Sequence, residues 1–364
     1  MFLIVTYSFL LIAGMSVSQW VDVGPAKDAL STLTIICLAY IMLEVGLEFH
    51  LDKEKQRHYV WDFCVATTAA VFPWLFCAIY LLFFFQLEWK QAFLIGLSAA
   101  PTSAGGLFAM LSAAGLSTTW LFRKARVLAI FDDLATILLM IPLQVAFIGF
   151  KLELVFVVVI IFCLLGVAYK WLHRLSWPIG KEWLFFYAMG MVSTLTLFER
   201  TTHIHLHVLF PAFTFGCLLN NHHQHQGSSI LKISLAFDQC VKGMFMFLVG
   251  CSLPKIEIGN VHPGVIILHV LALTILFNLG KCFCSLCYRN EASLKSRLAL
   301  SVAMFPRGEV GAGVLLIAIS YGFGGIAASL GVLSLALNLL LTGVFIAVVK
   351  VLIKQDEMIP KKKT

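Results

Sequence analysis

Long apolar runs separated by short polar connections extend through the whole chain. Each run is about 18–25 residues long, which as an α-helix is enough to cross a hydrocarbon layer of roughly 30 Å. The bilayer interior offers the backbone no hydrogen bonds, so a spanning segment must be a helix or part of a closed barrel. The alternating segments of about ten residues that a barrel requires are not visible. The runs therefore predict an all-α membrane protein.

We predict twelve transmembrane spans in a single domain over residues 1–355, followed by a basic tail at 356–364. The approximate spans are 2–20, 30–49, 60–86, 90–114, 125–149, 152–173, 182–199, 204–220, 231–253, 263–288, 293–321 and 325–352. Only 12% of the residues are charged, about half the share in a soluble domain. Too little polar surface is available to cover a water-soluble particle of this length.

Basic residues gather on one side of the predicted topology. Of the 26 Lys and Arg residues, 18 fall in the even-numbered loops and the C-terminal tail, and 5 fall in the odd-numbered loops. The positive-inside rule then places both termini in the cytoplasm. This placement accounts for the net charge of +7 without a nucleic-acid partner. We expect an integral protein of the cell membrane or of an inner membrane.

Two spans are interrupted by Pro and Gly near their middle. Span 4 contains Ala-Pro-Thr-Ser-Ala-Gly-Gly at 100–106, and span 11 contains Phe-Pro-Arg-Gly-Glu-Val-Gly at 305–311. These spans are seven apart, as are spans 2 and 9, which share an x-Val-Gly pattern near their ends. Because seven is odd, the partners cross the membrane in opposite directions. Paired broken helices in an inverted repeat are typical of secondary transporters, although ordinary kinks also contain Gly and Pro.

Span 5 carries two adjacent acids, Asp132 and Asp133, at a predicted depth of about 12 Å. Adjacent carboxylates have no structural use in lipid, so at least one should face a water-filled cavity. Burial favours the protonated acid, and hard cations prefer oxygen ligands. A proton and a cation would therefore exclude each other at the same oxygens. The hydroxyls of Thr102 and Ser103, with carbonyls freed by the break in span 4, are candidates to complete the oxygen shell.

Basic residues inside the spans are few, and each needs an anion. Lys281 lies at a depth similar to that of the two aspartates, so one of them is its natural partner, unless its side chain extends to the membrane interface. Arg307 and Glu309 lie within the break of span 11. They can pair with each other, or they can balance the charge of the half-helix ends.

The other intramembrane charges have simpler interpretations. Asp238 and Lys242 are four residues apart on one helix, which favours a local structural pair over a transport role. Glu44 and Glu48 lie near the cytoplasmic end of span 2 and are expected to be solvated. They are also alternative partners for Arg307.

Catalytic motifs are not visible in any segment. The sequence has no metal-binding His pair, nucleophile elbow or phosphate loop, so neither an enzyme nor a cofactor is expected. Three hypotheses remain, of which a cation/proton antiporter is favoured. The second is a sodium-coupled organic-solute symporter of similar inverted-repeat fold, which should not need Lys281. The third is a membrane scaffold or sensor without flux.

The chain resembles the sodium/proton exchangers of the monovalent cation:proton antiporter superfamily over nearly its whole length. The resemblance rests on Leu-Glu-Val-Gly-Leu-Glu at 43–48, Ala-Pro-Thr-Ser at 100–103, Phe-Asp-Asp at 131–133, Phe-Leu-Val-Gly at 247–250, Lys281 and Pro-Arg-Gly-Glu at 306–309. It implies a fold of NhaA type, in which the broken spans of an inverted repeat cross. It also implies a homodimer whose core moves against a dimerisation subdomain.

The same resemblance implies roles for individual residues. Asp133 would be the main cation ligand, and Asp132 would pair with Lys281 when no cation is bound. Relatives with an Asp-Asp pair and this lysine tend to be electrogenic. Potassium-efflux relatives usually carry Gln before a single Asp, and they have large cytoplasmic nucleotide-binding domains. The resemblance therefore favours Na⁺ or Li⁺ as the exchanged ion, with K⁺/H⁺ exchange as the alternative.

Overall fold

All regular structure is helical in the part of the chain that the computed structural model describes. That part comprises residues 2–20, 27–48, 56–103, 107, 111, 115–116, 119–148, 181–202, 208–220, 231–252 and 263–357. These residues form twelve α-helices and one 3-10 helix, with no strand among them. The predicted all-α architecture is confirmed. The predicted span at 152–173 and the basic tail beyond residue 357 lie outside the described residues.

The helices follow the predicted spans closely. The first half of the chain forms α1 (Phe2–Trp20), α2 (Lys27–Glu48), α3 (Gln56–Phe85), α4 (Trp89–Leu97) and α6 (Trp120–Ile148). The second half forms α8 (Lys181–Thr202), α9 (Leu209–Asn220), α10 (Leu231–Cys251), α11 (Pro263–Lys281), the 3-10 helix η4 (Cys282–Leu286), α12 (Leu294–Ala303), α13 (Glu309–Ser320) and α14 (Gly325–Glu357). The predicted span 11 thus comprises two helices, α12 and α13. The helix of span 4 ends at Leu97, and the rest of that span is described only at scattered positions.

The long helices have the dimensions and surface of membrane spans. By length and composition, α2, α3, α14 and the α11–η4 segment can each cross a membrane. With 30 residues, α3 is about 45 Å long. One face of α11 exposes only large aliphatic side chains, namely Val265, Ile267, Leu268, Leu271, Ile275 and Leu279. A surface of this kind is unfavourable in water but suits lipid, so the protein is integral to a membrane.

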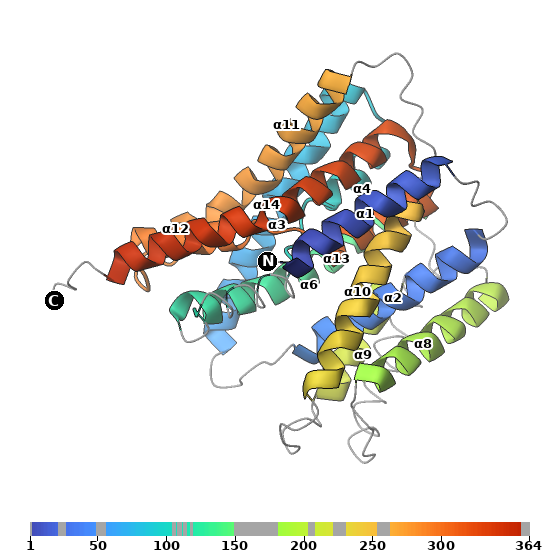
Figure 1. Ribbon diagram of the computed structural model, residues 1–364, viewed down its shortest axis with the longest axis horizontal. Helices are drawn as coiled ribbons and strands as arrows, with labels where there is room; N and C mark the ends of the chain where they lie inside the picture. The colour runs from blue at the N-terminus through green and yellow to red at the C-terminus, as the bar shows by residue number, and fades with distance from the viewer. Residues whose placement is uncertain are drawn as a thin grey trace.

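Two sets of helices make up the bundle (Figure 1). In one set, α1 lies along α10, and α2 packs against α8 and α9. In the other set, α3 packs against α4, α6 and α11, while α14 packs against α11 and α12. The sets meet where α13 contacts α2 and α10, and where α14 contacts α1. The interrupted segment between α12 and α13 therefore lies close to the boundary between the two sets.

Two helix pairs approach each other through glycine. Gly46 on α2 faces Gly216 on α9, and Gly250 on α10 faces Gly14 on α1. A Cβ atom on any of the four would overlap a backbone carbonyl oxygen of the opposite helix. Small residues allow membrane helices this close approach. A repeat that relates spans 1 and 2 to spans 8 and 9 would relate α1 to α9 and α2 to α10. It would map the contact between α1 and α10 onto the contact between α9 and α2, so it predicts that the two glycine contacts are alike.

Gly46→Ala should lower the unfolding free energy by about 1–3 kcal/mol, as overpacking of a close-packed site does. Gly190 in α8 is a matched control, because a Cβ there meets no atom within 4 Å. Alanine is the better helix former by about 1 kcal/mol, so Gly190→Ala should be neutral or stabilising. Thermal unfolding midpoints of the two purified variants check this. Equal behaviour of the two variants would contradict a backbone contact at Gly46.

Candidate ion-binding site

Asp132 and Asp133 lie near the middle of α6, and both side chains are fully buried, with an exposed fraction of 0%. A charge at this position costs several kcal/mol unless protein groups or ions compensate for it. Thr136, one helical turn further on, donates its hydroxyl to the backbone carbonyl of Asp132 at 2.9 Å. Threonine hydroxyls commonly bond back to the carbonyl four residues earlier, so this contact is local to α6.

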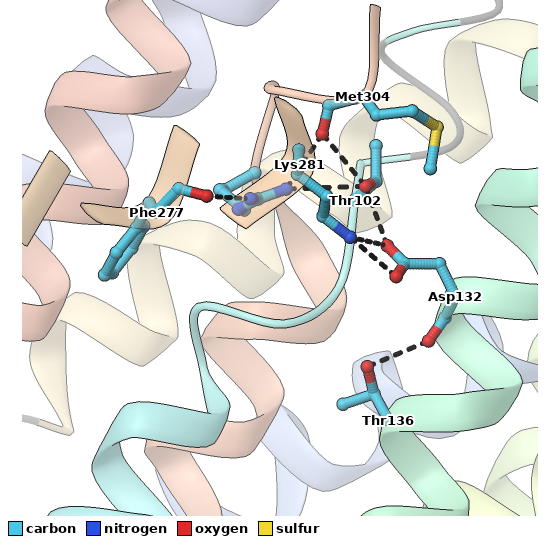
Figure 2. Close-up of polar contacts among 7 residues, drawn as sticks. Thr102, Asp132, Thr136, Phe277, Lys281 and Met304 are labelled. Carbon is cyan, nitrogen blue, oxygen red and sulfur yellow. Dashed lines mark hydrogen bonds and ion pairs between the residues drawn. The ribbon is translucent and has the colours of Figure 1, made fainter. Parts of the chain in front are cut away.

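Lys281 is the last residue of α11, and its ammonium binds Asp132 (Figure 2). Its Nζ atom donates to both carboxylate oxygens of Asp132 at 2.6 Å. Both side chains have an exposed fraction of 0%, so the lysine does not extend to the membrane interface. Hydrogen bonds between charged groups in a buried site are strong. This pair joins the middle of α6 to the end of α11, through two residues that lie 149 positions apart in sequence.

Thr102 connects the non-helical segment after α4 to this ion pair (Figure 2). Its Oγ1 atom lies 2.7 Å from Asp132 Oδ2 and 3.1 Å from the Met304 carbonyl oxygen. A hydroxyl has a single proton, and the shorter distance favours donation to the carboxylate. Thr102 therefore places a hydroxyl oxygen directly against the carboxylate of Asp132.

Ser103 connects the same segment to the break between α12 and α13. Its backbone N–H donates to the Pro306 carbonyl at 2.9 Å, and its hydroxyl donates to Glu309 Oε2 at 3.1 Å. The interrupted segments of spans 4 and 11 therefore contact each other. Whether the helices themselves cross stays a prediction, because most of residues 104–118 lie outside the described chain.

Arg307 does not pair with an acid in the described part of the chain, which corrects one expectation from the sequence. The fully buried guanidinium donates to the Phe277 carbonyl at 2.6 Å, to the Met304 carbonyl at 2.9 Å and to Thr102 Oγ1 at 3.4 Å. Helix α12 ends at Ala303, so carbonyl groups beyond it lack helical partners. An arginine with five N–H donors can satisfy such carbonyls.

The site can offer oxygen ligands from three sources. Carboxylates come from Asp132 and Asp133, hydroxyls come from Thr102 and Ser103, and carbonyls come from the interrupted segments. Hard cations are bound by such mixed oxygen sets. No group of three or more His, Cys, Asp or Glu side chains suitable for a metal is found in the described residues. A cation held here would therefore need hydroxyl or carbonyl oxygens beside the two carboxylates.

A second buried ionic cluster lies between α2 and α10, and it corrects the expectation that Glu44 is solvated. Lys242 Nζ is 2.7 Å from Glu44 Oε2 and 3.0 Å from Asp238 Oδ2. The Glu44 side chain retains an exposed fraction of 15%. The predicted Asp238–Lys242 pair forms, but it includes an acid from another helix. The side chain of Glu48 lies outside the described residues.

A third cluster joins α3, α6 and the connection before α12. The buried Asp62 accepts hydrogen bonds from Lys124 Nζ at 3.0 Å and from the Tyr288 hydroxyl at 2.7 Å. Lys124 Nζ also lies 3.2 Å from Glu291 Oε2. These contacts connect the start of α6 to α3 and to the segment between η4 and α12.

Two of three comparisons with known proteins found a match. The family model described as sodium/hydrogen exchanger, transmembrane, matches residues 3–355. The fold is similar to that of the sodium proton antiporter MjNhaP1 from Methanocaldococcus jannaschii at pH 8, with a TM-score of 0.71 and 14% sequence identity. This similarity covers 95% of this chain and 91% of the antiporter chain. A search of curated proteins found no match. Because the family model spans nearly all of the sequence, the chain belongs to the transmembrane sodium/hydrogen exchanger family.

Proposed function

We propose that this protein is a secondary active antiporter that exchanges Na⁺ or Li⁺ for H⁺ by alternating access. The cation and protons compete for Asp132 and Asp133, and Asp133 is the main cation ligand. Membership of the sodium/hydrogen exchanger family supports cation/proton antiport. The similar fold of MjNhaP1, itself a sodium proton antiporter, supports the same class of transport.

The contact between Lys281 and Asp132 carries the proposal. Both groups are buried, and Nζ is 2.6 Å from each carboxylate oxygen. A cation that approaches the two adjacent acids must compete with the ammonium as well as with protons for the same oxygens. Low polarity around the site strengthens each of these interactions. Occupancy by a cation and occupancy by protons therefore exclude each other, as exchange requires.

The remaining predicted site residues have supporting roles in this mechanism. Thr102 and Ser103 supply oxygen atoms beside the carboxylates. Arg307 and Glu309 compensate charge at the interrupted segments, where half-helix ends carry partial charges.

Electrogenic exchange follows if both acids release protons when one monovalent cation binds. Two protons then move in one direction for one cation in the other, so one net charge crosses per cycle. The Asp-Asp pair with a buried lysine supports this stoichiometry through the family resemblance. Both termini are cytoplasmic in this proposal, and the set of helices that contains α6 and α11 moves against the other set within a homodimer.

Purified protein in liposomes tests the proposal. A trapped pH dye reports proton movement when Na⁺, Li⁺, K⁺ or choline is added outside, at zero potential and at potentials of either sign. We expect Na⁺ or Li⁺ to drive proton movement at a rate that changes with the potential. Identical responses to Na⁺, Li⁺ and choline would exclude antiport of these cations. A rate that does not depend on the potential would exclude the electrogenic stoichiometry, and a response to K⁺ alone would establish K⁺/H⁺ exchange.

A further inference from the structure

Lys281 is the last residue of α11, and the chain continues from it as the 3-10 helix η4. The regular hydrogen bonds of the α-helix do not continue past this residue, and helix ends fray more easily than helix interiors. The position of the last turn of α11 therefore depends on its contacts with neighbouring elements. The contact between the ammonium and Asp132 depends on them as well, because Lys281 belongs to this turn.

Two of these contacts come from α3 and from the interruption after α12. The Phe277 carbonyl accepts a hydrogen bond from Arg307 at 2.6 Å (Figure 2). Gly280 packs so closely on α3 that a Cβ atom there would lie 2.4 Å from the nitrogen and from the Cδ atom of Pro73. Both contacts involve residues within four positions of Lys281.

A third contact comes from Asn338 on α14. Its Nδ2 atom donates to Asn278 Oδ1 at 3.0 Å, and Asn278 lies three residues before Lys281 on α11. Asn338 has an exposed fraction of 0%, and its own Oδ1 atom has no hydrogen-bond partner among the described residues. Burial of an amide with an unused acceptor costs free energy. Stability therefore does not account for an asparagine at this position.

We propose that Asn338 is a positioning residue, whose hydrogen bond to Asn278 fixes the last turn of α11 so that Lys281 contacts Asp132. Helix α14 suits this role because it is continuous over 33 residues, and Asn338 lies near its middle. The same helix contacts α1 in the other set of helices. The importance of Asn338 for transport rests on the proposed function, in which the ammonium and the cation compete for Asp132.

A double-mutant cycle for stability tests the proposal without a transport measurement. Reversible unfolding in detergent gives the unfolding equilibrium constants of the unchanged full-length protein, Asn338→Ala, Lys281→Met and the variant with both changes. An ammonium that is held less well loses less when it is removed. Lys281→Met should therefore change this constant about fivefold less in the Asn338→Ala background than in the unchanged protein.

Ser334→Ala is the matched control for this cycle. The Ser334 hydroxyl also joins α14 to α11, where it donates to the Val270 carbonyl at 3.3 Å, but this contact lies about three turns before Lys281. The effects of Ser334→Ala and Lys281→Met should therefore add. Additive effects of Asn338→Ala and Lys281→Met would overturn the proposal, as would an equal coupling of Lys281→Met to Ser334→Ala.

Asn278→Ala removes the same hydrogen bond from the other partner, and it decides the cycle if Asn338→Ala does not fold. Its loss should be coupled to Lys281→Met in the same direction, whereas additive effects would overturn the proposal.

Exchange in liposomes gives a second measurement on Asn338→Ala. The Na⁺ concentration for half-maximal exchange should fall about fivefold, because one hydrogen bond fewer holds the ammonium that competes for Asp132. A general loss of structure would lower the maximal rate instead. A half-maximal concentration that is unchanged or higher would overturn the proposal. Absence of exchange by the unchanged protein would overturn the antiporter function, and the stability cycle would still decide the role of Asn338.

Discussion

Asp133→Asn should abolish proton movement driven by Na⁺ or Li⁺ in liposomes. Asparagine keeps the size of the side chain but can neither ionise nor exchange a proton, so cation and proton no longer compete there. Loss of one buried charged partner costs about 2–5 kcal/mol, and each 1.4 kcal/mol is a factor of ten. We therefore expect any residual exchange to need a Na⁺ concentration roughly 100-fold higher or more. The dye assay described above measures this directly.

Glu88→Gln is the matched control for this loss. It neutralises an exposed carboxylate by the same chemical change, so exchange should match that of the unchanged protein. Thermal unfolding of both variants separates lost transport from lost structure. Normal exchange by a folded Asp133→Asn variant would rule out Asp133 as the cation ligand.

Lys281→Met should destabilise the protein by about 3–5 kcal/mol, the usual cost of leaving one member of a buried ion pair without its partner. The loss arises at Asp132, whose carboxylate has two 2.6 Å contacts with the ammonium. Reversible unfolding in detergent, followed by tryptophan fluorescence, measures the change.

The double variant Lys281→Met with Asp132→Asn should recover most of this stability. Replacement of a whole buried ion pair by neutral groups is often close to neutral, so the two changes should be strongly non-additive. Additive losses would show that the two side chains do not interact in the folded protein. The double variant should remain inactive in transport even though its stability returns.

Much of the fold was predictable because membrane spans depend on the length of apolar runs. The bounds of α1, α8 and α10 agree with the predicted spans to within three residues. The interruption between α12 and α13 falls at the predicted Pro-Arg-Gly segment, because Pro and Gly weaken helices in any context. The packing between helices was harder to predict from the sequence. The contacts of Gly46 and Gly250 depend on which helices meet, and spacing along the sequence does not fix that.

The candidate site was predictable where partners have opposite charges and similar depth. Lys281 and Asp132 satisfy both conditions, and the structure brings them together. Arg307 has the opposite charge to several acids at similar depth. Its hydrogen bonds nevertheless go to the backbone carbonyls of Phe277 and Met304. Every residue has a carbonyl, so no side-chain pattern marks these two acceptors. Glu44 was misjudged for a related reason, because its partner Lys242 lies on a helix that the sequence does not place beside α2.

Arg307 also has a consequence for the alternating access that we propose. One planar guanidinium holds the Phe277 carbonyl of α11 and the Met304 carbonyl at the end of α12, and Thr102 is within reach of the same group. The same side chain therefore contacts α11, the segment after α4 and the segment between α12 and α13. Unwinding of any one of these elements beside the carboxylates would break hydrogen bonds of Arg307. A movement of all three elements together as one rigid body keeps these bonds, so it costs less free energy.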